Sequence, residues 1–543
     1  MYKTVCVALL VVSLYSVHGE FLQTLNVSKL QELLPFSEDP AHDNMGHYTR
    51  IYGDVIIAGA YGNNNWRGKI YVFEKSSQSG LFEPLQELVA SHPMSLAYLG
   101  LNIDIWDDTI VGGAPYEEPL GEYRSGAVYV WQKGLNGLFQ LTQRLVPWDS
   151  QRSGFYGYSV AIEGNRLVVG ARFTKNEVDN IARAGKIYVY ERADQSSPFE
   201  LVQQLRGVVP RIHWADELRL NGDVLLAGAP RAYDGEGAAY VFHRIEGEWV
   251  EVQEFRVDAS NGVPADVNAH FGEGLAISSD GSYIVVAGER RDSEAGENTG
   301  GAQLYQRSGN QWEFKQHLDP PRRGNLRFGQ RLVAKGNFIF IGAWTSPETA
   351  SGAGAVYIYA KDVDGIFKLS NTVVNPMGQE NDNFGKMLDV TEDYLVIGAP
   401  KENQVSAVDS GVVHVYSIEE ADGCETTYVP TPTPMFEDFL GFVDEVLDVK
   451  DGLNEIGVNV ISVESGRVVQ ARLQVLESKK ILSTKTYSVE QGRTGLVVPV
   501  QVPEGVFESG EELQLRIAMF PEGSGWSERV IPGLFAFPKL VAS

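Results

Sequence analysis

The clearest pattern along the chain is a short apolar run that ends in glycine and returns seven times. Each run consists mainly of β-branched and other apolar residues, and its closing glycine lies 54 to 60 residues after the previous one. A period of this length indicates a repeat protein in which each unit is one supersecondary structure. The seven runs occupy residues 55–59, 109–113, 167–170, 224–228, 284–288, 338–342 and 394–398.

Three further elements accompany the runs at matching offsets. A strand opened by Phe-Gly or a relative precedes the run, as at residues 271–272, and a Gly-x-x-Tyr strand follows it, as at 126–131. A strand of the form aromatic-x-x-x-Gln-x-apolar ends the unit, as at 82–88. Four short strands joined by tight turns describe one blade of a β-propeller. We therefore predict an all-β fold with a seven-bladed β-propeller over residues 20–420.

The ends of the repeat region predict how the ring closes. The runs are apolar on both faces, as strands between neighbouring blades require. The seventh unit has no fourth strand after Ile418, whereas residues 30–33 copy the fourth-strand residues 85–88. We therefore expect an N-terminal strand within residues 20–34 to complete the last blade. Residues 22–25 are an alternative with a somewhat worse spacing.

The composition changes after the propeller. Residues 426–434 are rich in Thr and Pro, which is typical of an extended linker, and we place the linker at 421–436. Residues 437–543 contain six strand candidates, at 458–463, 468–476, 483–489, 495–502, 513–519 and 529–531. Their number and spacing predict a small immunoglobulin-like or fibronectin-like β-sandwich without a disulfide.

The N-terminal residues predict export. Lys3 precedes an apolar run, and small residues follow near position 19, so residues 1–19 read as a signal peptide. No later stretch is long and apolar enough to span a membrane. A secreted protein is expected to be glycosylated at Asn26 in the triplet Asn-Val-Ser. Cys424 is then the one cysteine of the mature chain, which leaves an intermolecular disulfide or an unpaired thiol without a role.

The charge of the chain excludes one class of partner. Its formal net charge is −26, and no stripe of Lys and Arg offsets this excess. Phosphate backbones are repelled by such a surface, so no nucleic-acid partner is expected.

The repeats resemble the FG-GAP repeats of integrin α-subunit head domains. The resemblance covers about residues 20 to 420 and rests on Phe-Gly openings, on Gly-x-x-Tyr strands and on Gly-Ala-Pro closings at 113–115, 228–230 and 398–400. It implies recognition or adhesion by a rigid disc. Calcium-binding blades of that family carry an Asp-rich loop between the first two strands, because calcium needs six to eight oxygen ligands. Here these connections are short turns such as 164–165 and 336–337, so we expect no metal there and no cofactor.

Candidate ligand-binding residues lie in the loops that vary most between repeats. These loops join second to third strands, and fourth strands to the next blade, on one face of a propeller. Aromatic and Arg side chains in such loops are typical of interface hot spots. The candidates are Trp66, Arg67, Tyr116, Tyr123, Arg124, Trp148, Tyr233, Arg290, Arg291 and Trp344.

These observations favour a secreted, non-enzymatic recognition or adhesion protein that binds a protein or matrix ligand. The sequence shows no paired metal-spaced histidines and no nucleophile elbow or phosphate loop, so we expect no enzyme. A lectin-like propeller that binds carbohydrate is the alternative, and an extracellular hydrolase or lyase is a weaker one. The oligomeric state does not follow from the sequence.

Overall fold

The computed structural model describes residues 25–37, 40–92, 94–207, 213–257, 268–292, 297–404 and 407–420, and the backbone of seven strands between 440 and 541. The chain divides into two compact units, Met1–Val429 and Pro430–Ser543. The predicted signal peptide 1–19, the linker 421–436 and Cys424 lie outside the described residues.

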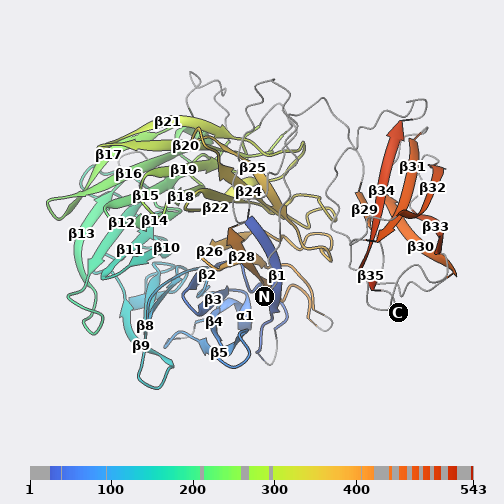
Figure 1. Ribbon diagram of the computed structural model, residues 1–543. Helices are drawn as coiled ribbons and strands as arrows, with labels where there is room; N and C mark the ends of the chain where they lie inside the picture. The colour runs from blue at the N-terminus through green and yellow to red at the C-terminus, as the bar shows by residue number, and fades with distance from the viewer. Residues whose placement is uncertain are drawn as a thin grey trace. The chain divides into compact units, whose positions relative to one another are not determined.

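The first unit is a seven-bladed β-propeller of four-stranded antiparallel sheets, which confirms the predicted fold (Figure 1). The first four blades consist of β2 (Thr49–Tyr52), β3 (Val55–Ala60), β4 (Lys69–Lys75) and β5 (Phe82–Leu88); β6 (Asn102–Trp106), β7 (Thr109–Ala114), β8 (Ala127–Lys133) and β9 (Phe139–Leu145); β10 (Tyr156–Glu163), β11 (Arg166–Ala171), β12 (Lys186–Glu191) and β13 (Glu200–Arg206); and β14 (Leu218–Asn221), β15 (Val224–Ala229), β16 (Ala238–Ile245) and β17 (Glu248–Phe255).

The last three blades follow the same order. They consist of β18 (Gly274–Ile277), β19 (Tyr283–Gly288), β20 (Gly301–Ser308) and β21 (Gln311–Leu318); β22 (Phe328–Lys335), β23 (Phe338–Ala343), β24 (Ala355–Lys361) and β25 (Phe367–Val373); and β26 (Met387–Val390), β27 (Tyr394–Ala399), β28 (Val412–Glu420) and β1 (Leu25–Leu33). The short helices α1 (Asn63–Trp66), η1 (Pro119–Gly121) and η2 (Tyr233–Gly235) lie in loops.

The N-terminal strand closes the ring. β1 pairs antiparallel with β28, with Leu25 opposite Glu420, Gln31 opposite Val415 and Leu33 opposite Val413, so blue and orange strands lie side by side in Figure 1. The copied residues 30–33 lie within β1. The fourth strand of the seventh blade therefore comes from the opposite end of the propeller sequence.

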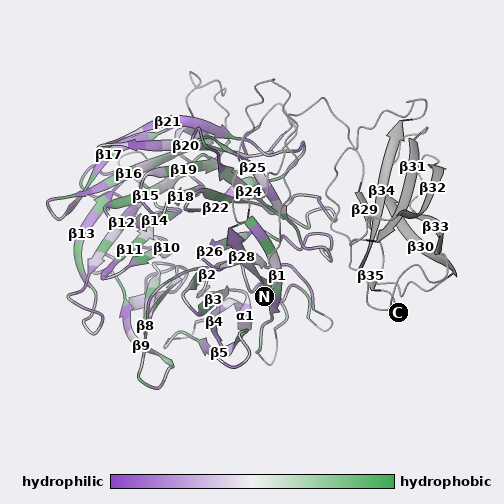
Figure 2. Ribbon diagram, viewed as in Figure 1, coloured by the Kyte–Doolittle hydropathy of each residue, from purple (hydrophilic) through white to green (hydrophobic). Residues whose placement is uncertain are grey.

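Apolar packing between the blades holds the ring together. The middle strands are buried on both faces, as in β15 and β23, whereas outer strands such as β17 and β21 are more hydrophilic (Figure 2). Buried clusters join neighbouring blades around the ring. Blades approach so closely that a Cβ atom on Gly113 would overlap the carbonyl oxygen of Gly157 in the next blade. This contact explains why Gly-Ala-Pro and Phe-Gly recur together.

A repeated hydrogen-bonded contact, which we call the glutamine clamp, joins outer strands of neighbouring blades. The Gln86 side chain donates to the backbone carbonyl of Phe139 and accepts from its N–H, both at 2.9 Å. Gln31 does the same with Phe82 across the closing junction, at 2.9 and 2.8 Å. The other clamps are Gln143 to Phe199, Gln203 to Trp249, Gln253 to Trp312 and Gln316 to Phe367.

The second unit is described by its strands alone. β29 (Leu440–Phe442), β30 (Gly452–Ile461) and β33 (Gly495–Val502) form one sheet. β31 (Arg467–Val475), β32 (Ile481–Val489), β34 (Glu512–Pro521) and β35 (Leu540–Val541) form another. The sandwich fold stays a prediction, and the strand candidate at 529–531 lies outside the described residues. In the described part of the chain no helix is long and apolar enough to span a bilayer.

Candidate functional site on the upper face

The loops with the predicted binding residues meet on one face of the propeller, which we call the upper face. It is formed by loops that join second to third strands and by loops that lead from one blade to the next. Neighbouring loops are tied together, since the N–H of Tyr98 donates to the carbonyl of Trp66 at 2.9 Å. The upper face divides into an aromatic and a charged half.

A continuous row of rings crosses the upper face from the first to the fourth blade. Ring centroids lie 5.9 Å apart between Tyr61 and Tyr98, 4.5 Å between Tyr98 and Tyr116, and 4.9 Å between Tyr116 and Phe155. The row continues to Phe173 at 5.2 Å. Edge-to-face and offset ring pairs at these separations are stabilising beyond the buried area. We define the aromatic arc as Tyr61, Trp66, Tyr98, Tyr116, Phe155, Phe173 and His213.

Arginines lie against the aromatic arc. The Arg124 guanidinium lies 5.2 Å from the ring centroid of Tyr116 and 4.8 Å from that of Tyr123. The Arg152 guanidinium lies 5.4 Å from the ring centroid of Tyr123. These cation–π contacts concentrate positive charge on one patch of a strongly acidic protein. The arc therefore presents rings and guanidinium groups together.

The charged half of the upper face lies over the fifth to seventh blades. Glu273 contacts His270 Nδ1 at 3.2 Å and accepts a hydrogen bond from Gln330 at 3.1 Å. The other end of the Gln330 amide accepts from Lys386. We define the charged sector as His270, Glu273, Glu289, Arg327, Gln330, Trp344 and Lys386.

The remaining members of the charged sector complete this network. The Lys386 ammonium lies 3.9 Å from the ring centroid of Trp344, whose indole N–H donates to Glu289 at 3.4 Å. Glu289 also pairs with Arg327 at 3.2 Å. The sector therefore alternates acidic, basic and neutral groups across three blades.

Burial and neighbouring charges shift pKa values in this sector. Burial alone would raise the pKa of Glu273, but its contact with His270 and the charge of Arg331 lower it to about 2. Burial lowers the pKa of Lys386 to about 8. His270 is 2% exposed, and its Nε2 atom is buried without a hydrogen-bond partner.

The structure brings together part of the predicted site. Trp66 and Tyr116 belong to the aromatic arc, Tyr123 and Arg124 border it, and Trp344 lies in the charged sector. Their role in binding stays a prediction.

The other predicted residues lie apart from these groups or beside them. Arg67 is half-buried, Trp148 is 81% exposed and Arg290 contacts Glu289. Tyr233 donates to Glu254 at 2.6 Å and packs under Arg256. Arg291 is 5% exposed and pairs with Asp319. Burial leaves little of Arg291 available to a ligand. Asn26 is exposed on β1, and its glycosylation stays a prediction.

Several site residues escaped the sequence analysis although they share one repeat position. Tyr98, Phe155, His213, His270 and Arg327 each precede the Phe-Gly pair or its relative. Each has a positive φ, between 53° and 59°. A left-handed residue other than glycine costs about 1 kcal/mol or more, and such strain at one repeated position is a reason to examine it for function. An aromatic, His or Arg residue directly before Phe-Gly is therefore a sequence feature that could have indicated these site residues.

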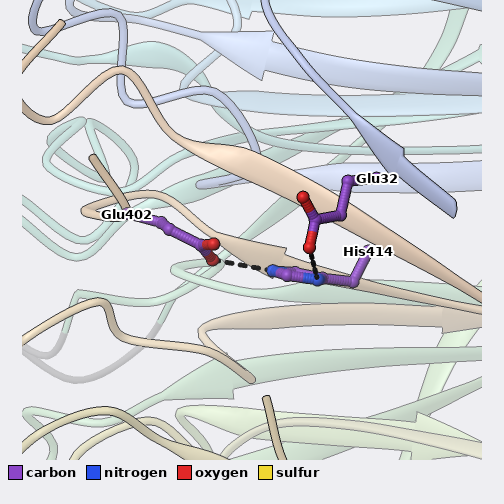
Figure 3. A group of neighbouring side chains, drawn as sticks. All are labelled: Glu32, Glu402 and His414. Carbon is purple, nitrogen blue, oxygen red and sulfur yellow. Dashed lines mark hydrogen bonds and ion pairs between the residues drawn. The ribbon is translucent and has the colours of Figure 1, made fainter. Parts of the chain in front are cut away.

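Two groups of described side chains contain enough carboxylate and imidazole ligands to be tested as cation sites: Glu32, Glu402 and His414, and His270, Glu273 and Glu289. In the first, Glu402 contacts His414 Nε2 at 2.7 Å and Glu32 lies 3.7 Å from Nδ1 (Figure 3). The two carboxylates thus face opposite ring nitrogens, which does not suit one shared ion. In the second group, Glu289 already forms ion pairs with Arg327 and Arg290, so its carboxylate is not available to a cation.

Comparison between blades explains the His414 contact. Its position corresponds to the Tyr of the Gly-x-x-Tyr strands, where Tyr129 donates to Glu117 at 2.9 Å and Tyr357 to Glu348 at 2.7 Å. His414 and Glu402 repeat this link between a third strand and an acidic loop residue. The group in Figure 3 is therefore a variant of a structural contact.

A cavity of about 660 Å³ opens on the opposite, lower face, where turns between first and second strands meet. Half-buried Tyr52, Trp106, Leu220, Ile277 and Val390 contribute to its walls. This volume lies within the range of small-molecule sites. None of the predicted binding residues lines it.

The comparisons with known proteins concern the propeller. The FG-GAP repeat family matches residues 139–190. No curated protein matches the chain. A periplasmic gluconolactonase, PpgL, of Pseudomonas aeruginosa is 14% identical and covers 66% of this chain and 98% of its own, with a TM-score of 0.41. Sqt1 from Chaetomium thermophilum is 13% identical over 73% of this chain and 100% of its own, with a TM-score of 0.43.

A third similar structure is the polysaccharide lyase Uly1, which is 10% identical over 73% of this chain and 99% of its own, with a TM-score of 0.44. Similarities at this level concern the fold alone. The expectation that the chain is not an enzyme is nevertheless corrected, because two of these three structures are named as enzymes and a propeller of this form can be enzymatic. The chain carries an FG-GAP repeat within a seven-bladed β-propeller, consistent with the propeller of integrin α-subunits.

Proposed function

We propose that the propeller recognises an extracellular protein through the aromatic arc and the arginines beside it. The observation that carries this proposal is the exposure of large apolar side chains at one place: Trp66 is 37%, Tyr123 39% and Leu96 46% exposed. Exposed apolar groups gathered on one face are typical of interaction sites.

The chemistry of the surface favours a protein with acidic side chains. Trp, Tyr and Arg dominate the energetics of protein interfaces, because they bury a large area with few rotatable bonds. Arg124 and Arg152 lie close to the Tyr123 ring, and guanidinium groups bind carboxylates through charge-assisted hydrogen bonds. Positive charge on this patch also directs an acidic partner to it and away from the acidic remainder.

The aromatic arc is not repeated around the ring, which argues against the lectin-like alternative. Tyr116 corresponds to Phe173 in the third blade, but to Arg231, Arg291, Thr345 and Lys401 in the fourth to seventh blades. A multivalent lectin would repeat its pocket in several blades, whereas one asymmetric patch fits a single protein partner.

The proposal is tested by measuring how much of the full chain binds to immobilised cell-surface extract. One portion of the extract is first treated with protease, and a second portion with glycosidases. We expect protease to abolish binding and the double variant Trp66→Ala/Tyr123→Ala to weaken it about tenfold or more. Leu135→Ala is the control, because Leu135 is fully exposed in a turn between β8 and β9 on the lower face. Binding that glycosidases alone remove would support the lectin, and an unaffected double variant would refute the proposed surface.

A further inference from the structure

Lys386 lacks the direct carboxylate partner that Lys69, Lys133 and Lys186 have. Lys186, which is 1% exposed, is neutralised by Asp149 at 2.8 Å. Lys69 and Lys133 pair with Glu87 and Glu74 in the same way. Among the described residues, no carboxylate oxygen lies within 4.0 Å of the Lys386 ammonium, although acidic residues outnumber basic ones by 71 to 45. A half-buried charge without a direct ion pair is less favourable than a paired one, and a ligand can supply the missing partner.

The surroundings hold Lys386 in place without neutralising it. Its ammonium donates to the Gln330 carbonyl oxygen and lies over the Trp344 ring at 3.9 Å. The Gln330 amide cannot reverse freely, because its nitrogen donates to Glu273 at 3.1 Å. An ammonium group has three N–H donors. One N–H donates to Gln330 and a second points toward the Trp344 ring, so one N–H donor remains for a ligand.

Charges of both signs surround Lys386, and among them Glu289 and Glu273 favour its charged form. Arg331 and Arg327 both disfavour its charge, and the pKa of His47 is held well below its ordinary value by burial and by Lys386, so that His47 is neutral. The two closest carboxylates are engaged: Glu273 by His270 and Gln330, and Glu289 by Arg327. These carboxylates reduce the local positive charge but leave the Lys386 ammonium without a direct partner.

We propose that Lys386 and Trp344 form a binding site for an oxyanion group, a carboxylate or a sulfate, carried by a small ligand. The ammonium donates a charge-assisted hydrogen bond to the oxyanion. The Trp344 ring, whose centroid lies 3.9 Å from the ammonium, forms one wall of the site. This site lies in the charged sector and does not require the protein partner of the aromatic arc.

Binding to this site should weaken at alkaline pH. Burial lowers the pKa of Lys386 to about 8, and the oxyanion binds the charged form. Binding is therefore strongest well below pH 8 and weakens as the pH rises through this value. Arg327 and Arg331 stay charged over this range, and Glu273, with a pKa of about 2, stays ionised.

Glucuronate, glucose 6-sulfate and uncharged glucose serve as probes with the full chain. Acetylation of Lys386 at pH 8, measured by peptide mass spectrometry, reports occupancy without any substitution, and calorimetry gives the affinity. We expect an anionic probe to protect Lys386 while glucose does not. Lys386→Met should weaken binding about tenfold or more and Lys386→Arg should retain part of it. Lys335→Met is the control, since Lys335 pairs with Glu392 on the lower face.

The probes also separate the two sources of the oxyanion. Protection by glucuronate alone assigns the site to carboxylates, protection by glucose 6-sulfate alone assigns it to sulfates, and protection by both supports a general oxyanion site. Equal effects of glucose and both anions, or no protection by any probe, would overturn the proposal. Neither result depends on protein binding to the aromatic arc, so the two proposals fail separately.

Discussion

The junction between the sixth and seventh blades differs from the other six junctions of the ring. Elsewhere a glutamine clamp fixes the outer strands with two hydrogen bonds, including the closing junction of Gln31 and Phe82. At the exceptional junction Asn371 replaces the glutamine, and its side chain reaches the carbonyl of Leu25 with one bond at 3.4 Å. Val27 stands where the other outer strands carry an aromatic residue.

The difference shows that the junction that closes the ring, between the seventh and first blades, is not the junction with the weakest hydrogen bonding between outer strands. The closing strand β1 has two neighbours: its Gln31 binds the first blade as firmly as any other clamp, while its start meets the sixth blade through Asn371. The apolar cluster of this junction, with Phe340, Ile358 and Leu388, is as buried as those elsewhere. We infer that the junction depends mainly on apolar packing.

The strongest test removes the apolar anchor of β1. Leu33 is 2% exposed in the cluster between the seventh and first blades. Leu33→Asp should lower the free energy of unfolding by about 3–5 kcal/mol, because it buries an unpaired charge. Urea unfolding followed by tryptophan fluorescence measures this loss. Leu34→Asp is the matched control at a side chain that is 43% exposed, and equal losses would show that β1 does not hold the ring.

Loss of one clamp should have an intermediate effect. Gln31→Ala leaves the N–H and carbonyl of Phe82 without these partners, so we expect a loss of about 1–3 kcal/mol. Gln86→Ala should cost a similar amount, whereas Asn371→Ala should cost about 0.5 kcal/mol or less because its single bond is long. Urea midpoints of the three variants compare the junctions directly. A larger loss for Asn371→Ala would reverse the ranking.

Installing a clamp at the exceptional junction should stabilise the ring modestly. The double variant Val27→Phe/Asn371→Gln supplies both residues that the other junctions share, and we expect a gain of about 1 kcal/mol. Differential scanning calorimetry would detect it as a higher melting temperature. Val27→Phe alone is the control, because it adds the ring without the amide. No gain beyond this control would mean that the backbone there cannot accept the clamp.

The smallest effect is expected for His414→Tyr. The substitution gives the seventh blade the tyrosine of the other Gly-x-x-Tyr strands, with Glu402 available as the acceptor. We expect the free energy of unfolding to change by less than about 1 kcal/mol, because one buried hydrogen bond replaces another. Chemical denaturation at neutral pH provides the measurement. A loss of several kcal/mol would show that His414 is more than a variant of the tyrosine contact.

The repeat was readable from the sequence because each blade needs the same residues for the same contacts. Gly113 recurs since a Cβ atom would meet the next blade, and Gln86 recurs since it binds Phe139. The residue that each of them contacts in the next blade could not be predicted, because contacts between blades leave no pattern in the neighbouring sequence. Closure by β1 followed from the missing fourth strand after Ile418 together with the copied residues 30–33.

The site was less predictable for a physical reason. Trp66 and Tyr116 stood out in variable loops, but Tyr98 and Phe155 lie next to repeat motifs, where aromatic residues are expected to pack. Lys386 looked ordinary in the sequence, since the absence of a carboxylate partner appears only when three blades converge. Clusters built from equivalent positions in different repeats therefore require the ring geometry.

The antiparallel pairing of Leu25 with Glu420 has a mechanical consequence. Both chain segments that leave the propeller do so from the same end of the β1–β28 pair. Tension applied across these two exits loads the hydrogen bonds of the pair one after another from Leu25 inward, as in a zipper. A strand pulled along its length would instead load all its bonds together. We therefore expect the β1–β28 pair to open at a lower force when it is pulled across these two ends than when it is pulled along its length.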